Sequence, residues 1–366
     1  MTEPMPELTP VTLITGFLGS GKTTVLQRLL RGPGFSDTAV LINEFGEIGL
    51  DHHLLERLDE TMVVLQSGCL CCTIRGELST AIKELYSKWE RGAVPLFRRL
   101  VIESTGLADP FPILSTVQAD PVLRHHFCLG NVITTVDGVN GIRQLDTQPE
   151  SVKQVAVADR LVLTKTDLAA ADTVRSLVER LRRINPLAPL WRSADQEVSA
   201  EALLLGDGFE GNSSEQWMPG HRPPALDGHP HGGGNRHDDD IRAVALSFNE
   251  PIDWTMFGIW LTMLLHRHGN EVLRVKGILN VAEVEAPIAV QGVQHLVHPP
   301  RHMTAWPDAN RQSRLVFIVK GLAPAAIERS LRAFSMMSAR VRSSPEAQHA
   351  VGLDGKGKDP GISSPQ

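Results

Sequence analysis

The feature that most constrains this chain is a glycine-rich segment that runs from Gly16 to Thr23 and reads GFLGSGKT. Apolar and β-branched residues at Val11–Thr15 predict a strand before it, and the residues after it predict a helix. Glycines let a backbone wrap closely around phosphate groups, and the amide groups at a helix N-terminus face negative charge. The spacing and this context indicate a phosphate-binding loop rather than a glycine-rich turn without a ligand.

The residue types in this loop predict separate contacts with a nucleotide. The Lys22 ammonium is expected to reach the β- and γ-phosphates, and the Thr23 hydroxyl is expected to bind Mg²⁺. The nucleotide contacts that we predict from this region come from Gly16, Gly19, Ser20, Gly21, Lys22, Thr23 and Thr24.

From residue 11 to about residue 205, short β-branched runs alternate with longer helical patterns, which is typical of a mostly parallel sheet with crossover helices. After Val11–Thr15, the predicted strands are Ala39–Ile42, Met62–Gln66, Arg99–Glu103, Val132–Val136 and Leu161–Thr164. Ligands bind outside the carboxyl ends of strands in open α/β sheets. The segments that follow these strands are therefore the candidates for a functional site.

The chain has 366 residues, which is enough for two domains. We expect an N-terminal tail at residues 1–10, an α/β domain of the P-loop NTPase type at 11–205, and a linker rich in His, Gly and Pro at 206–240. A small α+β domain at 241–340 and a disordered tail at 341–366 follow. The predicted elements of the second domain are strands at Ile241–Phe248, Val272–Leu279 and Arg314–Val319 and a helix at Trp254–Leu265.

A carboxylate ends the predicted strand Arg99–Glu103, and a glycine, Gly106, follows three residues later. In a nucleotide hydrolase, Glu103 at this position holds Mg²⁺ through water, and the Gly106 N–H senses the γ-phosphate. Many buried strands end in a carboxylate, so this assignment depends on the phosphate-binding loop upstream. The predicted catalytic residues are Lys22, Thr23 and Glu103, which stabilise charge while water attacks the γ-phosphate.

A possible base-reading segment, Thr164-Lys165-Thr166-Asp167, follows the strand Leu161–Thr164 and resembles the Asn-Lys-x-Asp motif of GTPases. The Asp167 carboxylate accepts hydrogen bonds from the two donors on the guanine edge, and the stem of Lys165 covers the base. Adenine offers no such pair of donors. The segment therefore predicts GTP as the nucleotide, with a solvated Lys and Asp after a strand as the alternative.

Three of the four cysteines, Cys69, Cys71 and Cys72, come directly after the strand Met62–Gln66. Thiolates bind soft and borderline cations such as Zn²⁺, Co²⁺ and Cu⁺, and structural zinc sites use wider Cys-x-x-Cys spacings. The compact cluster therefore indicates an open, exchangeable metal site. Buried small hydrophobic side chains and a redox pair are the alternatives. The segment Asn43–Asp51 lies where the first switch of a GTPase is expected, although a solvated acidic loop also fits it.

Histidines are concentrated in the predicted linker. Four of the 14 in the chain lie there, at His221, His229, His231 and His237. Neutral imidazoles on a flexible segment bind borderline cations, so weak metal binding is one interpretation and a spacer without function is the other.

Composition excludes two classes of partner. The formal net charge is -6 and no basic stripe gathers the Lys and Arg residues, so nucleic acid is not expected. No apolar run approaches the roughly 18 residues needed to cross a bilayer, and the first ten residues lack the basic and apolar regions of a signal peptide. We expect no membrane partner and a cytoplasmic protein, with a homodimer as an open alternative to a monomer.

In their order along the chain, these motifs resemble those of the CobW family of metallochaperone GTPases. The resemblance covers residues 16–24, 43–47, 68–73, 103–110 and 164–167, and continues at 274–278, 291–293 and 313–319. It implies a slow GTPase that uses GTP and Mg²⁺ and delivers zinc, cobalt or iron to a client metalloprotein. It also implies that the transition metal binds Cys69, Cys71 and Cys72, with Glu47 as an oxygen ligand. Some relatives carry a further glutamate where this chain has Ile42.

Two other functions compete with metal delivery. In a metal-sensing regulatory or activator module, GTP hydrolysis is incidental, and a hydrolysis rate that does not respond to metal or client would favour it. An ATP-dependent kinase or ligase also uses a phosphate-binding loop, but Asp167 argues against recognition of adenine.

Overall fold

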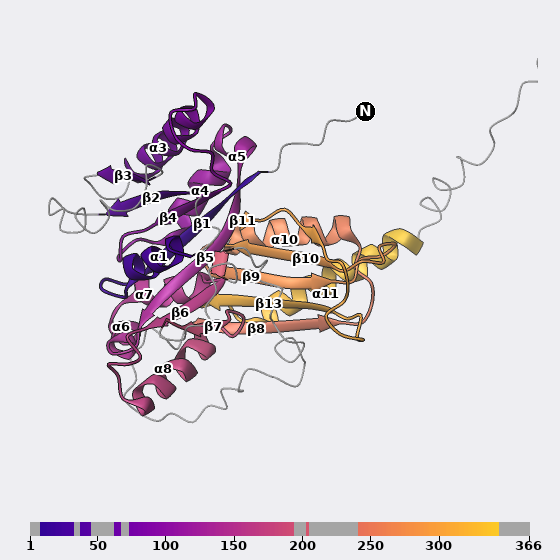
Figure 1. Cartoon of the computed structure of the whole chain (residues 1–366). Coiled ribbons are helices and arrows are strands. Elements are labelled where there is room, and N and C mark those ends of the chain that lie inside the picture. Colours follow the sequence, from indigo (N-terminus) through magenta and orange to yellow (C-terminus); the bar gives the residue numbers. More distant parts are fainter. Residues whose placement is uncertain are drawn as a thin grey trace, which may run out of the picture.

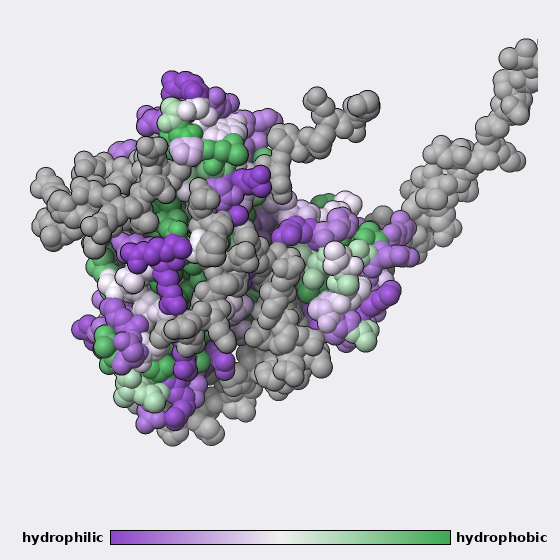
Figure 2. Space-filling view, viewed as in Figure 1, coloured by the Kyte–Doolittle hydropathy of each residue, from purple (hydrophilic) through white to green (hydrophobic). Residues whose placement is uncertain are grey.

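The computed structural model describes residues 8–32, 37–44, 62–66, 73–193, 203–204 and 241–343, which form two domains side by side (Figure 1). The first domain is built on a parallel sheet and the second on an antiparallel sheet. On the face shown in Figure 2, hydrophilic and apolar residues are interspersed. Among the helices of the described residues, none has the length and apolar character needed to cross a bilayer. The predicted fold class, a P-loop NTPase domain followed by a small α+β domain, is confirmed.

The N-terminal sheet contains seven strands within the described residues, in the order β3-β2-β4-β1-β5-β6-β7. Every neighbouring pair is parallel. The strands are β1 (Thr9–Gly16), β2 (Thr38–Glu44), β3 (Met62–Gln66), β4 (Arg99–Glu103), β5 (Phe127–Asp137), β6 (Arg160–Thr164) and β7 (Leu190–Arg192).

Two strands of the N-terminal sheet, β1 and β5, begin more than one residue earlier than the sequence pattern predicts. β1 starts at Thr9, inside the expected tail, and β5 starts at Phe127 rather than at Val132. The two extensions pair with each other, since Thr9 lies opposite Phe127 in the register. Gly130 and Asn131 interrupt the apolar run of β5 and hide its first half from a sequence pattern.

Helices cover both faces of the N-terminal sheet. They are α1 (Lys22–Leu30), α3 (Thr73–Glu90), α4 (Pro110–Ala119), α5 (Leu123–His126), α6 (Gly141–Thr147), α7 (Pro149–Val157) and α8 (Ala171–Ile184). Side chains of neighbouring strand residues point to opposite faces. Leu13 and Ile102 therefore pack in the cluster that includes α3, α4, α7 and α8, whereas Ile14 and Val101 pack against α1.

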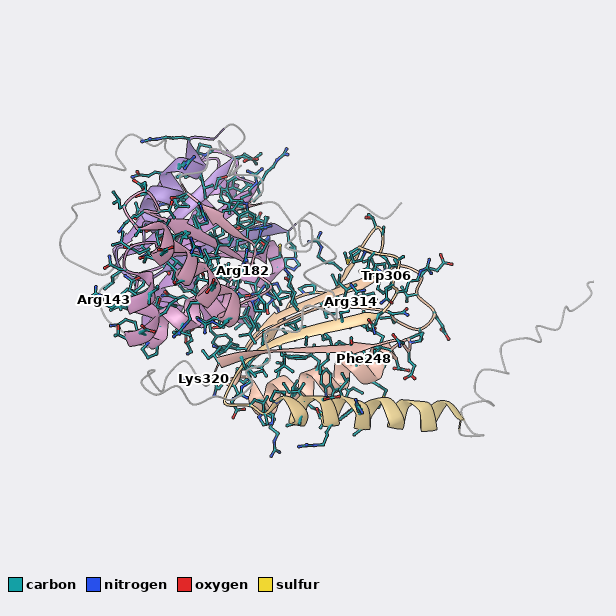
Figure 3. All side chains as sticks on the ribbon, turned by 90° about the horizontal axis from the view of Figure 1, so that it is seen from below. Arg143, Arg182, Phe248, Trp306, Arg314 and Lys320 are labelled. Atoms are coloured by element: carbon teal, nitrogen blue, oxygen red, sulfur yellow. The ribbon has the colours of Figure 1, made fainter. Side chains whose placement is uncertain are left out.

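The C-terminal domain is an antiparallel sheet in the order β11-β10-β9-β13-β8, with β12 paired to β10. Its elements are β8 (Ile241–Phe248), α10 (Trp254–His268), β9 (Val272–Leu279), β10 (Ile288–Val293), β11 (Leu296–Val297), β12 (Arg301–His302), β13 (Ser313–Lys320) and α11 (Pro324–Ser343). Helices α10 and α11 lie on one side of this sheet (Figure 3) and share a buried cluster with Leu315, Phe317 and Val319 of β13. The Asp253 carboxylate caps the start of α10 by accepting from the N–H of Met256.

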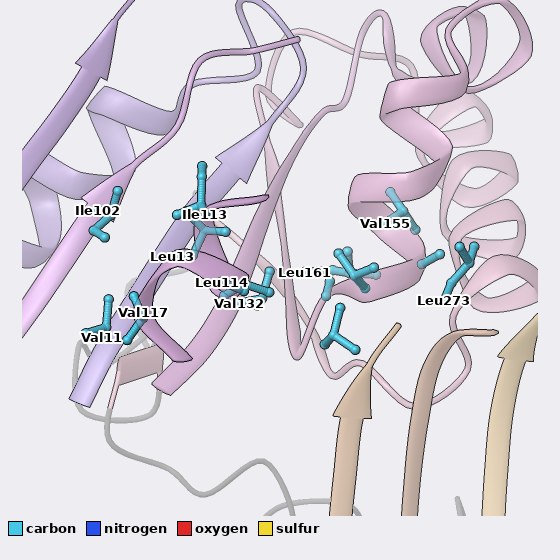
Figure 4. Close-up of a cluster of buried hydrophobic side chains, with 14 of the residues drawn as sticks. Val11, Leu13, Ile102, Ile113, Leu114, Val117, Val132, Val155, Leu161 and Leu273 are labelled. Carbon is cyan, nitrogen blue, oxygen red and sulfur yellow. The ribbon is translucent and has the colours of Figure 1, made fainter. Parts of the chain in front are cut away.

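The opposite face of the C-terminal sheet packs against the N-terminal domain. Leu273 of β9, Val293 of β10 and Ile318 of β13 belong to the main hydrophobic cluster of the N-terminal domain. In the close-up of this cluster, Leu273 lies beside Val155 of α7 (Figure 4). The two domains therefore share one continuous apolar core, which fixes β9 against α7.

Candidate functional site

The glycine-rich segment connects the end of β1 to the start of α1. Three of its glycines have positive φ angles, with Gly16 at 140°, Gly19 at 70° and Gly21 at 86°, which residues with a Cβ atom rarely adopt. A Cβ atom on Gly16 would also lie 2.4 Å from the carbonyl oxygen of Thr135 on β5. The loop therefore requires glycine, and it turns at the carboxyl edge of the sheet, where parallel strands present ligands.

Hydroxyl groups from two other strands hold this loop in place. Ser20 Oγ lies 2.6 Å from Thr135 Oγ1, and both residues are buried. The Thr164 hydroxyl donates to the carbonyl oxygen of Ser20 over 2.8 Å. The threonine that stands where GTPases usually have asparagine thus anchors the phosphate-binding loop to β6.

The Lys22 side chain folds back over the loop. Its Nζ donates to the carbonyl oxygens of Gly16, at 3.0 Å, and Phe17, at 3.2 Å. Gly19 and Thr24, on either side of the helix start, are exposed. A cation held against a glycine-rich loop beside a helix N-terminus is well placed to meet phosphate oxygens.

Thr23 and Glu103 meet beside the loop. Thr23 Oγ1 donates to Glu103 Oε1 over 2.6 Å. Glu103 ends β4 and is only 5% exposed, and the next backbone N–H, of Ser104, donates to the carbonyl oxygen of Ile14 on β1 over 2.9 Å. Hydroxyl and carboxylate oxygens are the hard ligands that Mg²⁺ takes beside a bound phosphate. The donor chemistry of this pair fits a magnesium ion.

The segment after β4 packs directly against the phosphate-binding loop. A Cβ atom on Gly106 would lie 2.5 Å from the backbone nitrogen of Leu18, so only glycine allows this approach. On the other side, Gln154 of α7 donates to the carbonyl oxygens of Gly106 and Ala108, each over 3.1 Å. Gly106 is therefore held between the phosphate-binding loop and α7.

The predicted base-reading segment joins the same edge through Lys165. This residue has a φ of 53°, which is uncommon for a residue with a side chain. Its Nζ donates to the carbonyl oxygen of Gly19 over 2.7 Å and to Asp137 Oδ2 over 2.8 Å. Asp167, two residues further on, is exposed. Lys165 thus links the end of β6, the end of β5 and the phosphate-binding loop.

Asp137, at the end of β5, is the buried partner of Lys165 and is 2% exposed. Its Oδ1 accepts from the backbone N–H groups of Val139, at 2.8 Å, and Asn140, at 3.0 Å. Burial alone raises the pKa of Asp137, but the hydrogen bonds from Lys165, Asn140 and Val139 outweigh it and hold the pKa below its ordinary value. Asp137 is therefore a fixed negative charge beneath Lys165.

Sequence analysis missed Asp137 and Gln154. Asp137 directly follows the predicted strand Val132–Val136, so the rule that ligands gather at strand ends was a usable signal. Gln154 lies inside a helix without distinctive spacing, and only the folded chain brings it to Gly106.

The predicted ligands of the transition metal lie outside the described residues. They are Cys69, Cys71, Cys72 and Glu47, together with the linker residues His221, His229, His231 and His237. A search of the described part of the chain finds no group of three or more His, Cys, Asp or Glu side chains that could hold a metal ion. The cysteine segment lies in the sequence between the end of β3 at Gln66 and the start of α3 at Thr73.

Comparison with known proteins gives two matching family models. Residues 10–192 match the CobW/HypB/UreG nucleotide-binding domain, and residues 241–335 match the C-terminal domain of the cobalamin synthesis protein cobW. The chain is 34% identical over 308 residues to the zinc chaperone YjiA of Escherichia coli strain K12, covering 84% of this chain and 93% of that protein. It is 30% identical over 359 residues to the zinc chaperone CobW of Pseudomonas aeruginosa, covering 88% and 90%.

The fold is similar to that of a solved relative. The crystal structure of the Zn(II)-bound YjiA GTPase from Escherichia coli aligns with a TM-score of 0.63 and 28% identity, and the alignment covers 90% of this chain and 99% of that one. The sequence match and the structural match both extend across the two domains. The chain belongs to the CobW family.

Proposed function

We propose that this chain is a GTPase that couples the binding and hydrolysis of GTP to the delivery of a transition metal, zinc in the first place, to a client metalloprotein. The observation that carries this proposal is the meeting of three segments at the carboxyl edge of one parallel sheet. These are the loop after β1, Glu103 at the end of β4 and Lys165 after β6. The names of the relatives, which are zinc chaperones, support both the metal and its delivery.

The nucleotide lies along this edge. Lys22 leaves its carbonyl partners for the β- and γ-phosphates, and the Gly106 N–H meets the γ-phosphate. The stem of Lys165 covers the guanine base while the Asp167 carboxylate accepts from the guanine edge, and Asp137 positions Lys165. The remaining contacts come from Gly16, Gly19, Ser20, Gly21, Thr23, Thr24 and Thr164.

Thr23 and Glu103 would hold Mg²⁺, the first through its hydroxyl and the second through water bound to its carboxylate. The ion supplies neutralisation of charge on the phosphate oxygens. Lys22 adds a second positive charge from the protein, at the loop that binds the same phosphates. Lys22, Thr23 and Glu103 are therefore the residues on which hydrolysis of the γ-phosphate by water depends.

Zinc binds the thiolates of Cys69, Cys71 and Cys72, with Glu47 as an oxygen ligand, and the linker histidines take up further ions weakly. The topology of the sheet supports coupling of this site to the nucleotide. β3 and β1 are parallel strands of one sheet, separated by β2 and β4, so their carboxyl ends share an edge about 14 Å apart. The segment that follows β2 begins between the two sites and is a physical route for coupling.

We further propose that the protein acts in the cytoplasm, where cysteines stay reduced and exchange metal. Its partner is the client protein rather than nucleic acid or a membrane. A homodimer is the assembly to test first, by the mass of the protein in solution with GDP and with a GTP analogue.

The experiment that tests the function measures zinc affinity in the nucleotide-free, GDP and GTPγS states by competition with a chromophoric chelator. We expect GTPγS to change zinc affinity by about 5- to 150-fold, and zinc to change GTPγS affinity by the same factor, because linkage is reciprocal. Cys71→Ser should remove the tight zinc site together with the coupling. Cys128→Ser is the matched control, since Cys128 lies at the start of β5, opposite Pro10 and far from the carboxyl edge. Equal zinc affinities in all three states would contradict metal delivery driven by GTP.

A further inference from the structure

Gln154 of α7 holds the backbone of the loop that carries Gly106. Gln154 is fully buried, and its amide nitrogen donates to both Gly106 and Ala108 over 3.1 Å. A primary amide nitrogen has two hydrogens, so these bonds use its full donor capacity. The Thr134 hydroxyl donates to the carbonyl oxygen of Gln154 over 2.8 Å and fixes the helix backbone at the same point.

The C-terminal end of α7 is bonded to the C-terminal domain. Arg274 of β9 donates to the carbonyl oxygen of Val157, the last residue of α7, over 2.6 Å. Arg274 also pairs with Asp159, and both side chains are buried. Gln154 and Val157 are three residues apart, so they lie about 4.5 Å apart along the helix axis. One turn of helix therefore separates the bond to the Gly106 loop from the bond to the second domain.

A second contact joins the same loop to the C-terminal domain more directly. Phe111, in the first turn of α4, lies against the ring of His295 in the turn between β10 and β11, with 5.9 Å between ring centroids. Asp109 caps α4 by accepting from the N–H of Phe111, and Lys153 of α7 pairs with the same carboxylate over 2.7 Å. The segment from Gly106 to Phe111 thus contacts both α7 and the turn between β10 and β11 of the C-terminal domain.

We propose that Gln154 is a positioning residue that ties the Gly106 loop to α7, and that α7 transmits the state of the nucleotide to strand β9 of the C-terminal domain. The proposal rests on the proposed function, in which Gly106 senses the γ-phosphate. A shift of Gly106 toward a γ-phosphate either moves Gln154 with it or leaves the buried Gly106 carbonyl group without its donor, which is unfavourable. Because α7 packs into the core shared by both domains, a shift of α7 changes the contacts of β9.

The test compares the wild-type protein with Gln154→Leu, which keeps the volume of the side chain and removes both donors. Gln144→Leu is the matched control because it changes a buried glutamine of the neighbouring helix α6. Two quantities are measured for each protein. The first is the affinity for GDP and for GTPγS, and the second is the hydrogen exchange of backbone amides in β9, in β10 and β11, and in the loop at residues 104–109 in each nucleotide state.

We expect exchange in β9 of the wild type and of Gln144→Leu to differ between the GDP and GTPγS states. In Gln154→Leu this difference should disappear, and the affinity for GTPγS should fall by roughly 5- to 30-fold, much more than the affinity for GDP. Arg274→Lys keeps the positive charge that faces Asp159 but is designed to remove the hydrogen bond between β9 and the end of α7. In that variant the loop should still respond to GTPγS while β9 does not, and this outcome is measurable even where Gln154→Leu fails to fold.

A wild-type response of β9 that persists in both Gln154→Leu and Arg274→Lys would overturn the proposal, as would equal losses of GDP and GTPγS affinity in Gln154→Leu. A wild-type protein that binds both nucleotides without any response of β9 would also overturn it, with the nucleotide site intact. Failure of the proposed function itself is a different result, since the wild type would then bind neither nucleotide.

Discussion

Two ion pairs join segments of this protein that are distant in the sequence. One lies at the carboxyl ends of the strands of the N-terminal sheet and the other at their amino ends. Lys165 and Asp137 pair at the carboxyl edge, where the lysine side chain is 37% exposed and the aspartate side chain 2%. Arg274 and Asp159 pair at the amino end of β6, where both are nearly inaccessible, at 1% and 3%. The carboxyl ends of the strands thus carry the proposed nucleotide site, and the amino end of β6 carries a contact with the second domain.

The two ion pairs differ in solvent exposure and in the groups that surround them. The Lys165 side chain is partly exposed, and its ammonium donates to a loop carbonyl as well as to Asp137. Arg274 is instead surrounded by fixed acceptors, the Val157 carbonyl oxygen and Asp159, and Asp159 accepts from the Val132 N–H over 2.9 Å. Burial alone raises the pKa of Asp159, but Arg274 and then Lys276 outweigh it and hold the pKa below its ordinary value.

Breaking the buried pair should give the largest effect. We expect Arg274→Ala to lower the free energy of unfolding by about 3–5 kcal/mol, because it leaves the Asp159 carboxylate buried without its main partner. Arg332→Ala is the matched control, since Arg332 pairs with Glu328 on the exposed side of α11 with side chains 73% and 47% exposed. That change should cost below about 0.5 kcal/mol. Urea unfolding measures both, and similar losses in the two variants would show that the interdomain pair is not a main contact.

Acid should weaken the same interface through His298, which is buried beside this pair and 5% exposed. Burial lowers the pKa of His298 from 6.5 to about 4, with Asp159 opposing the shift and Arg274 adding to it. The unfolded chain therefore binds the proton more tightly between these values, and stability falls as the pH drops from about 6.5 to about 4. The loss from this residue is about 3 kcal/mol at about 1.4 kcal/mol per pH unit.

The variant His298→Gln should flatten the fall in stability over that range, measured as urea midpoints at several pH values. Asp159 does not produce the same slope. Its pKa is lowered, so its contribution is lost only as the pH falls below its ordinary value of 3.8. The control is His302→Gln, at an exposed position on β12, which should keep the wild-type slope. An unchanged slope in His298→Gln would contradict this source of acid sensitivity.

The two edges also differ in how far they could be predicted. At the carboxyl edge, each predicted contact comes from the end of a strand or from the segment that follows it, and Lys22, Thr23, Glu103 and Lys165 do converge there. Local spacing was enough because parallel strands deliver their ends to one edge. The fold class, β1 to β6 of the N-terminal sheet and β8, β9 and β13 of the C-terminal sheet were predicted from the same short-range patterns, whereas β10, β11 and β12 were not.

The contact between the two domains could not be predicted from local patterns. Arg274 and Asp159 are separated by 115 positions, and no spacing rule links them. Charged residues at alternate positions of β9, Arg274 and Lys276, suggest a face exposed to solvent, yet both are 1% exposed because that face meets the N-terminal domain. Gln154 was missed for the same reason, since its role depends on which loop its helix packs against.

The last and smallest effect that we predict is at the half-open pair. Asp137→Asn keeps an oxygen for the Val139 and Asn140 amides but removes the charge that holds Lys165, so Lys165 should lose its fixed position over the base and against Gly19. We expect GTP affinity to fall about tenfold, equivalent to about 1.4 kcal/mol, without loss of the preference for GTP over ATP. Asp167→Ala should instead remove the preference itself, because in the proposed site that carboxylate accepts both hydrogen bonds from the guanine edge. Asp172→Asn, which changes an exposed pair with Arg175 on α8, should leave GTP affinity within about twofold. If Asp137→Asn binds GTP as tightly as the wild type does, the Lys165–Asp137 pair takes no part in nucleotide binding. Its role would then be to stabilise the fold, as the Arg274–Asp159 pair does.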